Sequence, residues 1–364
     1  MTKLSFPMFL VILLISCGDD DSGSGKTEPT LYFPPVGSAT WETLSPSALG
    51  WNETEIAELD DFLNDTDTRA LLVLKDGKIV IEKYSGKQLL NTSLDFTSTS
   101  NWYWASAGKT LTSALVGIAE SQGKIDFEDK TADYLGTGWT SLATEQENKI
   151  KVRHQLTMTT GLDDGVGNRD CTDPSCLTYL AEPDTRWAYH NAPYTLLDGV
   201  IEEATGKTLN TYVNDEIKTG TGMDGQYIQT GDNNVFYSTP RSMARFGLLL
   251  LNKGKWDQIQ IIPEDYVELM TTTSQNMNLS YGYLTWLNGK SSFMIPTSQF
   301  VFNTSVSPNA PDDMFAAMGK NGQLINVVPG ENLVVIRMGD APDDNLVPFT
   351  FQDDLWLKLN EIIP

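Results

Sequence analysis

Hydrophobic positions along this chain recur in two periods, one typical of helices and one typical of strands. The clearest helical stretch begins at Ser106 and ends near Gly123, because glycine commonly follows the last turn of a helix. Within it, apolar residues recur at spacings of three and four: Leu111, Leu115, Ile118 and Ala119. This spacing places one apolar stripe on one face of the helix. We therefore expect Ser106 in the first turn of a helix that packs against a core.

Strand patterns occur near both ends of the chain. Four segments rich in apolar residues are predicted to be strands: residues 70–74, 79–84, 323–328 and 333–337. Asp76 and Gly77 separate the first two strands and form a typical hairpin turn. Pro329 and Gly330 separate the last two strands, which predicts a second hairpin.

Helical patterns dominate the chain between these hairpins. They cover residues 153–159, 194–204, 209–217, 241–252 and 263–270, and further candidates lie at 53–63 and 356–363. Strands at both ends of a helical middle predict an α/β (α+β) fold with one antiparallel sheet flanked by helices. We expect the sheet to come from about 67–105 and 314–364, with a mostly helical region inserted at about 106–290.

The N-terminus has the features of an export signal. After Lys3, residues 4–15 form an apolar run that is too short to span a bilayer but fits the core of a signal peptide. The sequence Leu-Ile-Ser-Cys at 14–17 resembles a bacterial lipoprotein signal, in which Cys17 would carry the lipid. Residues 18–25 are acidic and small, so residues 1–25 are predicted to be a signal and a flexible tether. The alternative is a plain cleaved signal in which Cys17 is incidental.

Composition narrows the possible partners. The net charge of −23 argues against a nucleic-acid partner, because phosphates would be repelled. Cys171 and Cys176 flank a proline at a spacing that allows a small disulfide loop in an oxidising compartment. A metal site on these cysteines would need further ligands, and the only histidines are His154 and His190. We expect neither a metal nor another cofactor.

Ser106 and Lys109 are candidates for nucleophilic catalysis. The free N–H groups and the positive end of a helix favour an alkoxide that develops in the first turn. Lys109 follows three residues later, so both side chains emerge on one face. A lysine can accept the serine proton if burial or a neighbouring cation lowers its pKa from about 10.4. The alternative is an ordinary exposed helix start, and a second copy of the spacing at Ser121 and Lys124 straddles the end of the helix.

Two later segments carry further candidate site residues. Tyr189 and Asn191 lie two apart in an irregular stretch, where a phenol could carry a proton and a carboxamide could hold a substrate carbonyl or the lysine. Residues 319–323 are Gly-Lys-Asn-Gly-Gln and open a predicted C-terminal strand. If that strand lies at an edge, its N–H groups can face an oxyanion, and Lys320 adds positive charge near the substrate.

Together these segments match the signature of a known superfamily. The three motifs stand in order as Ser106-Ala107-Gly108-Lys109, Tyr189-His190-Asn191 and Lys320-Asn321-Gly322. They resemble the Ser-x-x-Lys, Tyr-x-Asn and Lys-Thr-Gly motifs of the serine β-lactamase-like hydrolases. That superfamily comprises class C β-lactamases, D-Ala-D-Ala carboxypeptidases and related esterases of the family VIII type. The resemblance covers roughly residues 50–340 and implies that residues 26–364 form one catalytic unit.

The resemblance implies an acyl-enzyme mechanism. Ser106 would attack a carbonyl carbon, while Lys109 and Tyr189 would share the general-base and general-acid roles. A small-molecule or peptide ester or amide is the expected substrate, and the motifs alone do not separate esterase, peptidase and β-lactamase. The alternative is a penicillin-binding-like sensor or binding protein with the same fold but without turnover.

The resemblance also assigns the substrate contacts. Asn191, Lys320 and Gly322 would bind and orient the substrate, and the N–H groups of Ser106 and Gln323 would form the oxyanion hole. Lys-Asn-Gly stands where many penicillin-recognising relatives have Lys-Thr-Gly, so the hydroxyl that these relatives offer to a substrate carboxylate is absent. By the lipoprotein resemblance, we expect an exported protein held to a bacterial cell membrane, at its periplasmic face or at the cell surface.

Overall fold

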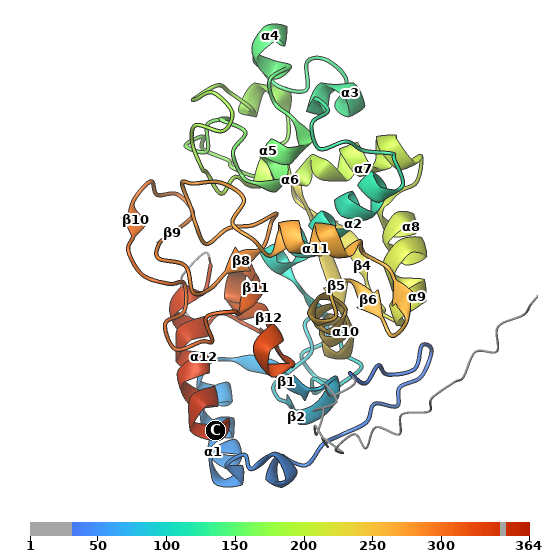
Figure 1. Ribbon diagram of the computed structural model, residues 1–364, viewed down its shortest axis with the longest axis vertical. Coiled ribbons are helices and arrows are strands. Elements are labelled where there is room, and N and C mark those ends of the chain that lie inside the picture. Colours follow the sequence, from blue (N-terminus) through green and yellow to red (C-terminus); the bar gives the residue numbers. More distant parts are fainter. Residues whose placement is uncertain (1–30, 343–346) are drawn as a thin grey trace, which may run out of the picture. The chain divides into compact units, whose positions relative to one another are not determined.

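A computed structural model of the protein describes residues 31–342 and 347–364 (Figure 1). The predicted lipoprotein signal, the tether and Cys17 lie outside the described residues. Within the described ranges, no helix is long and apolar enough to cross a membrane.

A six-stranded antiparallel sheet joins the two ends of the chain. Its strands lie in the order β2-β1-β13-β12-β11-β8. Their bounds are β1 Thr68–Lys75, β2 Lys78–Tyr84, β8 Trp286–Leu287, β11 Phe315–Gly319, β12 Gln323–Val328 and β13 Leu333–Gly339. β1 pairs with β13, so that Thr68 lies opposite Gly339 and Lys75 lies opposite Leu333. The predicted antiparallel sheet built from N- and C-terminal segments is therefore confirmed.

Smaller strands and numerous helices complete the fold. The remaining strands are β3 Trp102–Tyr103, β4 Gln226–Thr230, β5 Asn233–Ser238, β6 Lys255–Trp256, β7 Ile259–Gln260, β9 Phe293–Met294 and β10 Val301–Phe302. The helices are α1 Glu53–Asp65, α2 Gly108–Ser121, α3 Thr131–Leu135, α4 Thr144–Glu147, α5 Val152–Leu156, α6 Asn191–Thr195, α7 Leu197–Thr205, α8 Leu209–Val213, α9 Thr219–Thr221, α10 Pro240–Leu251, α11 Glu264–Met270 and α12 Phe349–Ile362.

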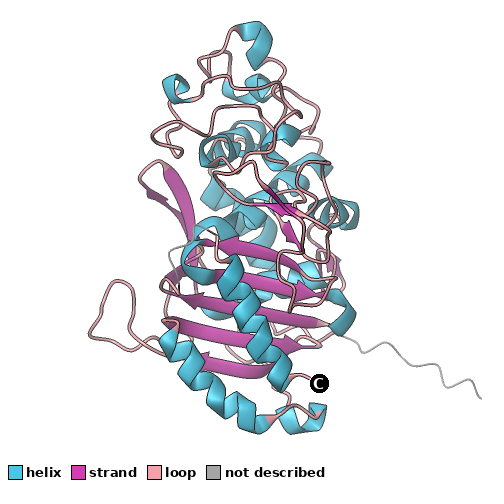
Figure 2. Ribbon diagram, turned by 90° about the vertical axis from the view of Figure 1, so that its left-hand side faces the viewer, coloured by secondary structure: helices cyan, strands magenta, loops and turns pink. Residues whose placement is uncertain are grey.

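Helices cover both faces of the sheet. α1 and α12 pack together over one face, and Figure 2 shows two helices lying across the stacked strands. α10 lies against β1, β12 and β13 on the other face, where Val334, Ile325 and Ile336 are the side chains nearest to Gly247. The apolar stretch 70–74 of β1 is fully buried between these layers.

The central helix α2 is buried on nearly all sides, and its buried residues include polar ones such as Lys109 and Thr112. Its residues from Gly108 to Ala119 are buried, as expected for a helix that is surrounded by other elements. The helix begins two residues later than predicted, because Ser106 lies in a 3-10 turn at Ala105–Ala107 that leads into α2.

Residues 319–323 open a C-terminal strand as predicted, because β12 begins at Gln323 and Lys320–Gly322 form the turn that joins it to β11. The expectation of an edge strand is wrong, since β12 lies between β11 and β13. Asn321 and Gly322 both have positive φ angles, 63° and 71°. Asn-Gly is the residue pair that such a tight turn favours, and this signal was available in the sequence.

Candidate active site

Ser106 lies where β3 ends and α2 begins. Ala105, the residue before it, has a φ of 46°. Left-handed backbone at a residue other than glycine is strained and clusters at functional sites. The conformation turns the chain sharply, so that Ser106 remains half-exposed while the residues after it are buried.

Lys109 is buried directly beneath Ser106. Its Nζ donates a hydrogen bond of 3.2 Å to the Ser106 Oγ, and only 4% of the residue is exposed. Burial lowers the pKa of Lys109 to about 7, against the opposing effect of the carboxylates of Asp170 and Asp198. Because burial disfavours the charged ammonium, a large fraction of Lys109 is neutral near pH 7 and can accept a proton.

Two tyrosine rings lie beside the lysine. The Lys109 Nζ is 3.9 Å from the centre of the Tyr194 ring and 5.3 Å from the centre of the Tyr189 ring. The Tyr194 hydroxyl lies 3.3 Å from the Thr112 Oγ1. Tyr194 was predicted only as the start of a helix, and no sequence motif identified it as a site residue.

Tyr189 faces the serine as a neutral phenol. Burial raises the pKa of Tyr189, and a hydrogen bond with Ser106 opposes that rise only in part. A phenol with a raised pKa stays protonated at neutral pH, so it can donate a hydrogen bond or a proton. Lys109 is therefore the better base and Tyr189 the better proton donor.

Asn191 begins α6 at the same cavity. Its Nδ2 donates a hydrogen bond of 2.7 Å to the Asp170 Oδ1. The structure therefore pairs this carboxamide with Asp170, a residue that the sequence patterns did not single out.

The third motif reaches the cavity through Lys320 alone. Gly322 packs closely against the Arg337 side chain. A Cβ at this position would lie only 2.6 Å from the Arg337 Nη1. The Gln323 side chain is fully buried and donates a 2.6 Å hydrogen bond to the Gly339 carbonyl. The Asn321 Nδ2 donates to the Tyr103 hydroxyl at 2.7 Å. Gly322 and Gln323, which the resemblance assigned to the substrate, are not among the residues that line the cavity.

Gly319 lies very close to the backbone of Trp104 and Ser106. A Cβ on Gly319 would lie 3.1 Å from the Ser106 nitrogen and 2.3 Å from the Trp104 carbonyl oxygen. Gln323 is the partner of Gly319 on the next strand inward. Because glycine has no side chain, the end of β11 can lie directly against the backbone of the turn at Ala105–Ala107, which carries Ser106.

Ser106, Lys109 and Asn191 line one cavity of about 220 Å³, whereas Tyr189 is not among its lining residues. Its lining residues are Ala105, Ser106, Lys109, Asp170, Asn191, Tyr194, Asn233, Asn234, Val235 and Lys320. Four tryptophans near the site motifs are buried in the hydrophobic core and do not line the cavity: Trp102, Trp104, Trp187 and Trp286.

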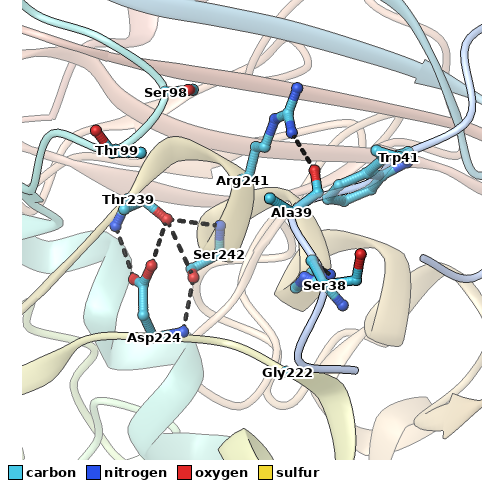
Figure 3. A pocket seen from close by; sticks show the side chains of 11 residues that line it. Ser38, Ala39, Trp41, Ser98, Thr99, Gly222, Asp224, Thr239, Arg241 and Ser242 are labelled. Carbon is cyan, nitrogen blue, oxygen red and sulfur yellow. Dashed lines mark hydrogen bonds between the residues drawn. The ribbon is translucent and has the colours of Figure 1, made fainter. Parts of the chain in front are cut away.

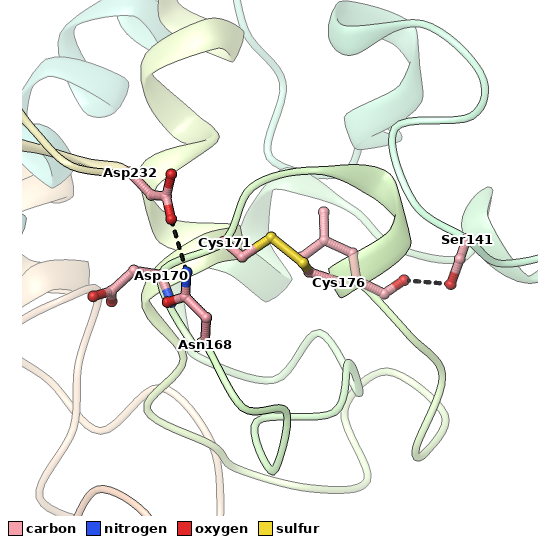
Figure 4. The surroundings of a disulfide bond; sticks show 7 residues. Ser141, Asn168, Asp170, Cys171, Cys176 and Asp232 are labelled. Carbon is pink, nitrogen blue, oxygen red and sulfur yellow. Dashed lines mark hydrogen bonds between the residues drawn. A yellow bond between two sulfur atoms is a disulfide. The ribbon is translucent and has the colours of Figure 1, made fainter.

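A disulfide stabilises the loop on one side of the cavity. Cys171 and Cys176 are joined, as their spacing predicted (Figure 4). Asp170 immediately precedes this loop, and the Asn168 Nδ2 donates a hydrogen bond of 2.9 Å to the Asp232 Oδ2 on the turn before β5. The disulfide and this contact hold the chain on both sides of Asp170.

A second hollow lies near the N-terminus of α10 (Figure 3). Its arginines are already engaged within the protein. Arg241 forms an ion pair with Glu82, and Arg245 donates to backbone carbonyls that include those of Pro34 and Thr221. Over residues 31–342 and 347–364, no group of three His, Cys, Asp or Glu side chains is placed to hold a metal ion.

Comparisons with known proteins agree on one family. A family model described as Beta-lactamase matches residues 63–345. An Escherichia coli (strain K12) protein, provisionally named as a D-alanyl-D-alanine carboxypeptidase, is 20% identical, and the match covers 92% of this chain and 90% of that protein. Penicillin-binding protein 4* of Bacillus subtilis (strain 168) is 25% identical over 42% of this chain and 36% of its own length.

Solved structures show the same fold. The octameric penicillin-binding protein homologue from Pyrococcus abyssi superposes with a TM-score of 0.61 at 15% identity, covering 85% of this chain and 77% of that chain. EstCE1, a hydrolase with promiscuous acyltransferase activity, superposes with a TM-score of 0.62 at 12% identity, covering 86% of this chain and 99% of that chain.

Proposed function

The chain belongs to the Beta-lactamase family, and from that premise we propose that it is a serine hydrolase that forms an acyl-enzyme through Ser106. One observation carries this proposal: the Ser106 Oγ accepts a 3.2 Å hydrogen bond from a lysine whose pKa burial lowers to about 7. A serine with a neutral amine in hydrogen-bond reach has the base that a weak nucleophile requires.

The first step is acylation. Neutral Lys109 takes the proton of the Ser106 hydroxyl as Oγ attacks the carbonyl carbon of an ester or amide. The carbonyl oxygen becomes an oxyanion, and its collapse breaks the bond to the leaving group, which receives a proton from Tyr189 or the Lys109 ammonium. Water then attacks the acyl-enzyme, and the reverse proton transfers release the acid and restore Ser106.

The oxyanion needs two donors close to Ser106. The Ser106 N–H is one, and we assign the other to the backbone where β11 turns at Gly319 and Lys320, because Gly319 lies against the Ser106 nitrogen. Backbone donors that are already fixed in place require no reorganisation during the reaction, and one such donor contributes about 10²–10³ in rate.

We also propose a location for the protein. The run at 4–15 and Cys17 support an exported protein anchored by lipid to a bacterial cell membrane. We propose a small-molecule or peptide substrate for the cavity of about 220 Å³ that holds Ser106. The relatives include a penicillin-binding protein and a hydrolase with acyltransferase activity, which leaves esterase, peptidase and β-lactamase as branches of one proposal.

Parallel assays test the proposal. Protein lacking residues 1–25 is given a p-nitrophenyl short-chain ester and a chromogenic cephalosporin. Ser106→Ala is compared with Ser121→Ala, whose hydroxyl donates only to the Ile118 carbonyl. We expect Ser106→Ala alone to abolish turnover, and the preferred substrate identifies the branch.

Two other outcomes remain informative. Activity that survives in Ser106→Ala rules out the proposed nucleophile. Wild-type protein that acquires the acyl mass on Ser106 with one equivalent of p-nitrophenol, but releases no acid, is the non-turnover sensor of the alternative.

A further inference from the structure

We propose that Asp170 makes this hydrolase selective for substrates that carry a protonated amino group. The inference rests on the proposed function, because it concerns the cavity that holds Ser106. Asp170 is the only acidic side chain among the residues that line this cavity. Neither the sequence motifs nor the family resemblance assigns it a role.

The Asp170 carboxylate is held in place by a hydrogen bond and not by an ion pair with any residue that the structure describes. Its Oδ1 accepts the 2.7 Å hydrogen bond from Asn191. Within the part of the chain that the structure describes, no lysine or arginine forms an ion pair with it. The residue is half-exposed, so a ligand in the cavity can reach the carboxylate. A fixed carboxylate with free hydrogen-bonding capacity is complementary to an ammonium group.

The surrounding chain restrains the backbone that carries Asp170. Besides the Cys171–Cys176 disulfide, the Asp170 N–H donates to the Asn168 Oδ1 at 3.0 Å. The Ala192 N–H donates to the Arg169 carbonyl at 3.0 Å, which ties this loop to α6. Figure 4 shows Asp170 beside the disulfide, with Asn168 joined to Asp232. A carboxylate whose flanking backbone is already restrained loses little conformational entropy when a ligand binds.

The charges of the cavity fit such a substrate. Lys320 also lines the cavity, so the cavity offers one anionic and one cationic exposed group to a substrate. An ammonium group near Asp170 would also disfavour the protonated form of Lys109, which keeps the proposed base neutral. The net charge of −23 further attracts cations from solution.

Matched ester pairs test the inference. The ethyl esters of glycine, β-alanine and 6-aminohexanoic acid are compared with their N-acetylated forms, which lack the charge. Three chain lengths are used so that the spacing from the ester to the amine does not decide the result. The rate of acid release gives kcat/KM for each ester. The quantity compared between variants is kcat/KM for the free-amine ester divided by kcat/KM for its acetylated partner.

The variants separate this inference from the proposed function. Wild type is expected to prefer the free amine in at least one pair. Asp170→Asn should lower that ratio about tenfold, the scale of one hydrogen bond to a charged group. Asp173→Asn removes the same charge from the same loop outside the cavity, and it should leave the ratio unchanged. Ser106→Ala should abolish turnover of every ester, and activity in that variant would overturn the proposed function itself.

A binding measurement covers the case of a variant that folds poorly or an ester that is not hydrolysed. Ligand-observed NMR compares hexylammonium with hexanol on the wild-type protein. We expect hexylammonium to bind, and to be displaced while p-nitrophenyl acetate acetylates Ser106 with release of p-nitrophenol, whereas hexanol should bind at least tenfold more weakly. Equal binding of the two compounds, or an amine preference that Asp170→Asn does not reduce, would overturn the proposal.

Discussion

The ammonium nitrogen of Lys109 lies 3.9 Å from the centre of the Tyr194 ring. A ring face attracts a cation, so this contact favours the charged form of a lysine that burial otherwise makes neutral. The pKa of Lys109 therefore results from opposing effects, and burial is the largest of them.

Tyr194→Leu should move the pH dependence of turnover. Removing the ring takes away stabilisation of the ammonium and lowers the Lys109 pKa by about 1 unit. Because the neutral lysine is the proposed base, kcat/KM rises as pH increases through this pKa, and its acidic limb should move to lower pH. Profiles between pH 5 and 9 check this. Tyr194→Phe keeps the ring and should keep the wild-type limb; equal shifts in both variants would contradict the role of the ring face.

Lys109→Met should abolish turnover and stabilise the fold. In wild type, folding lowers the lysine pKa from about 10.5 to about 7. The unfolded chain therefore binds the proton more tightly, which destabilises the native state below pH 10.5. This cost is largest below pH 7 and decreases as pH rises from 7 to 10.5. Urea unfolding should show Lys109→Met to be more stable by about 4 kcal/mol at pH 7, with a smaller difference at pH 10. A difference that does not change with pH would contradict the buried neutral lysine.

Gly319→Ala should damage both folding and turnover. The new Cβ would lie 2.3 Å from the Trp104 carbonyl oxygen and 3.1 Å from the Ser106 nitrogen, so β11 must move away from the turn that carries Ser106. We expect kcat to fall by at least about 10² through loss of the oxyanion geometry. Gly167→Ala is the matched control, because a Cβ there meets nothing within 4 Å. Wild-type kcat in Gly319→Ala would place the oxyanion hole elsewhere.

Replacing both Cys171 and Cys176 with serine should loosen the loop that carries Asp170. Closing so short a loop stabilises a protein by about 2 kcal/mol in the chain-entropy model, and urea unfolding measures that loss. The preference for amine-bearing esters should fall as well, because Asp170 adjoins the disulfide. An unchanged preference would show that Asn191 alone is enough to hold the carboxylate.

The sequence predicts the local parts of this protein well. The hairpin at Asp76 and Gly77, the apolar helix after Ser106 and the spacing of Ser106 to Lys109 all depend on residues close together in the chain, where turn chemistry and helical period decide the result. The antiparallel sheet from both ends also followed from the order of the patterns.

The remainder of the site depends on long-range packing. Tyr194 and Asp170 meet Lys109 only after three separate segments have folded together, and no periodic pattern encodes that meeting. The interior position of β12 is also a long-range property, because it depends on β11 and β13 pairing on its two sides.

The pairing of β1 with β13 also has a consequence for biosynthesis. Thr68 and Gly339 are neighbours in the sheet, so the first strand to leave the ribosome must wait for almost the whole chain before its permanent partner exists. Such distant pairing makes folding slow. Nascent or truncated chains that end before Leu333 therefore lack the strand between β1 and β12, and we expect quality-control proteases to recognise them as unfolded.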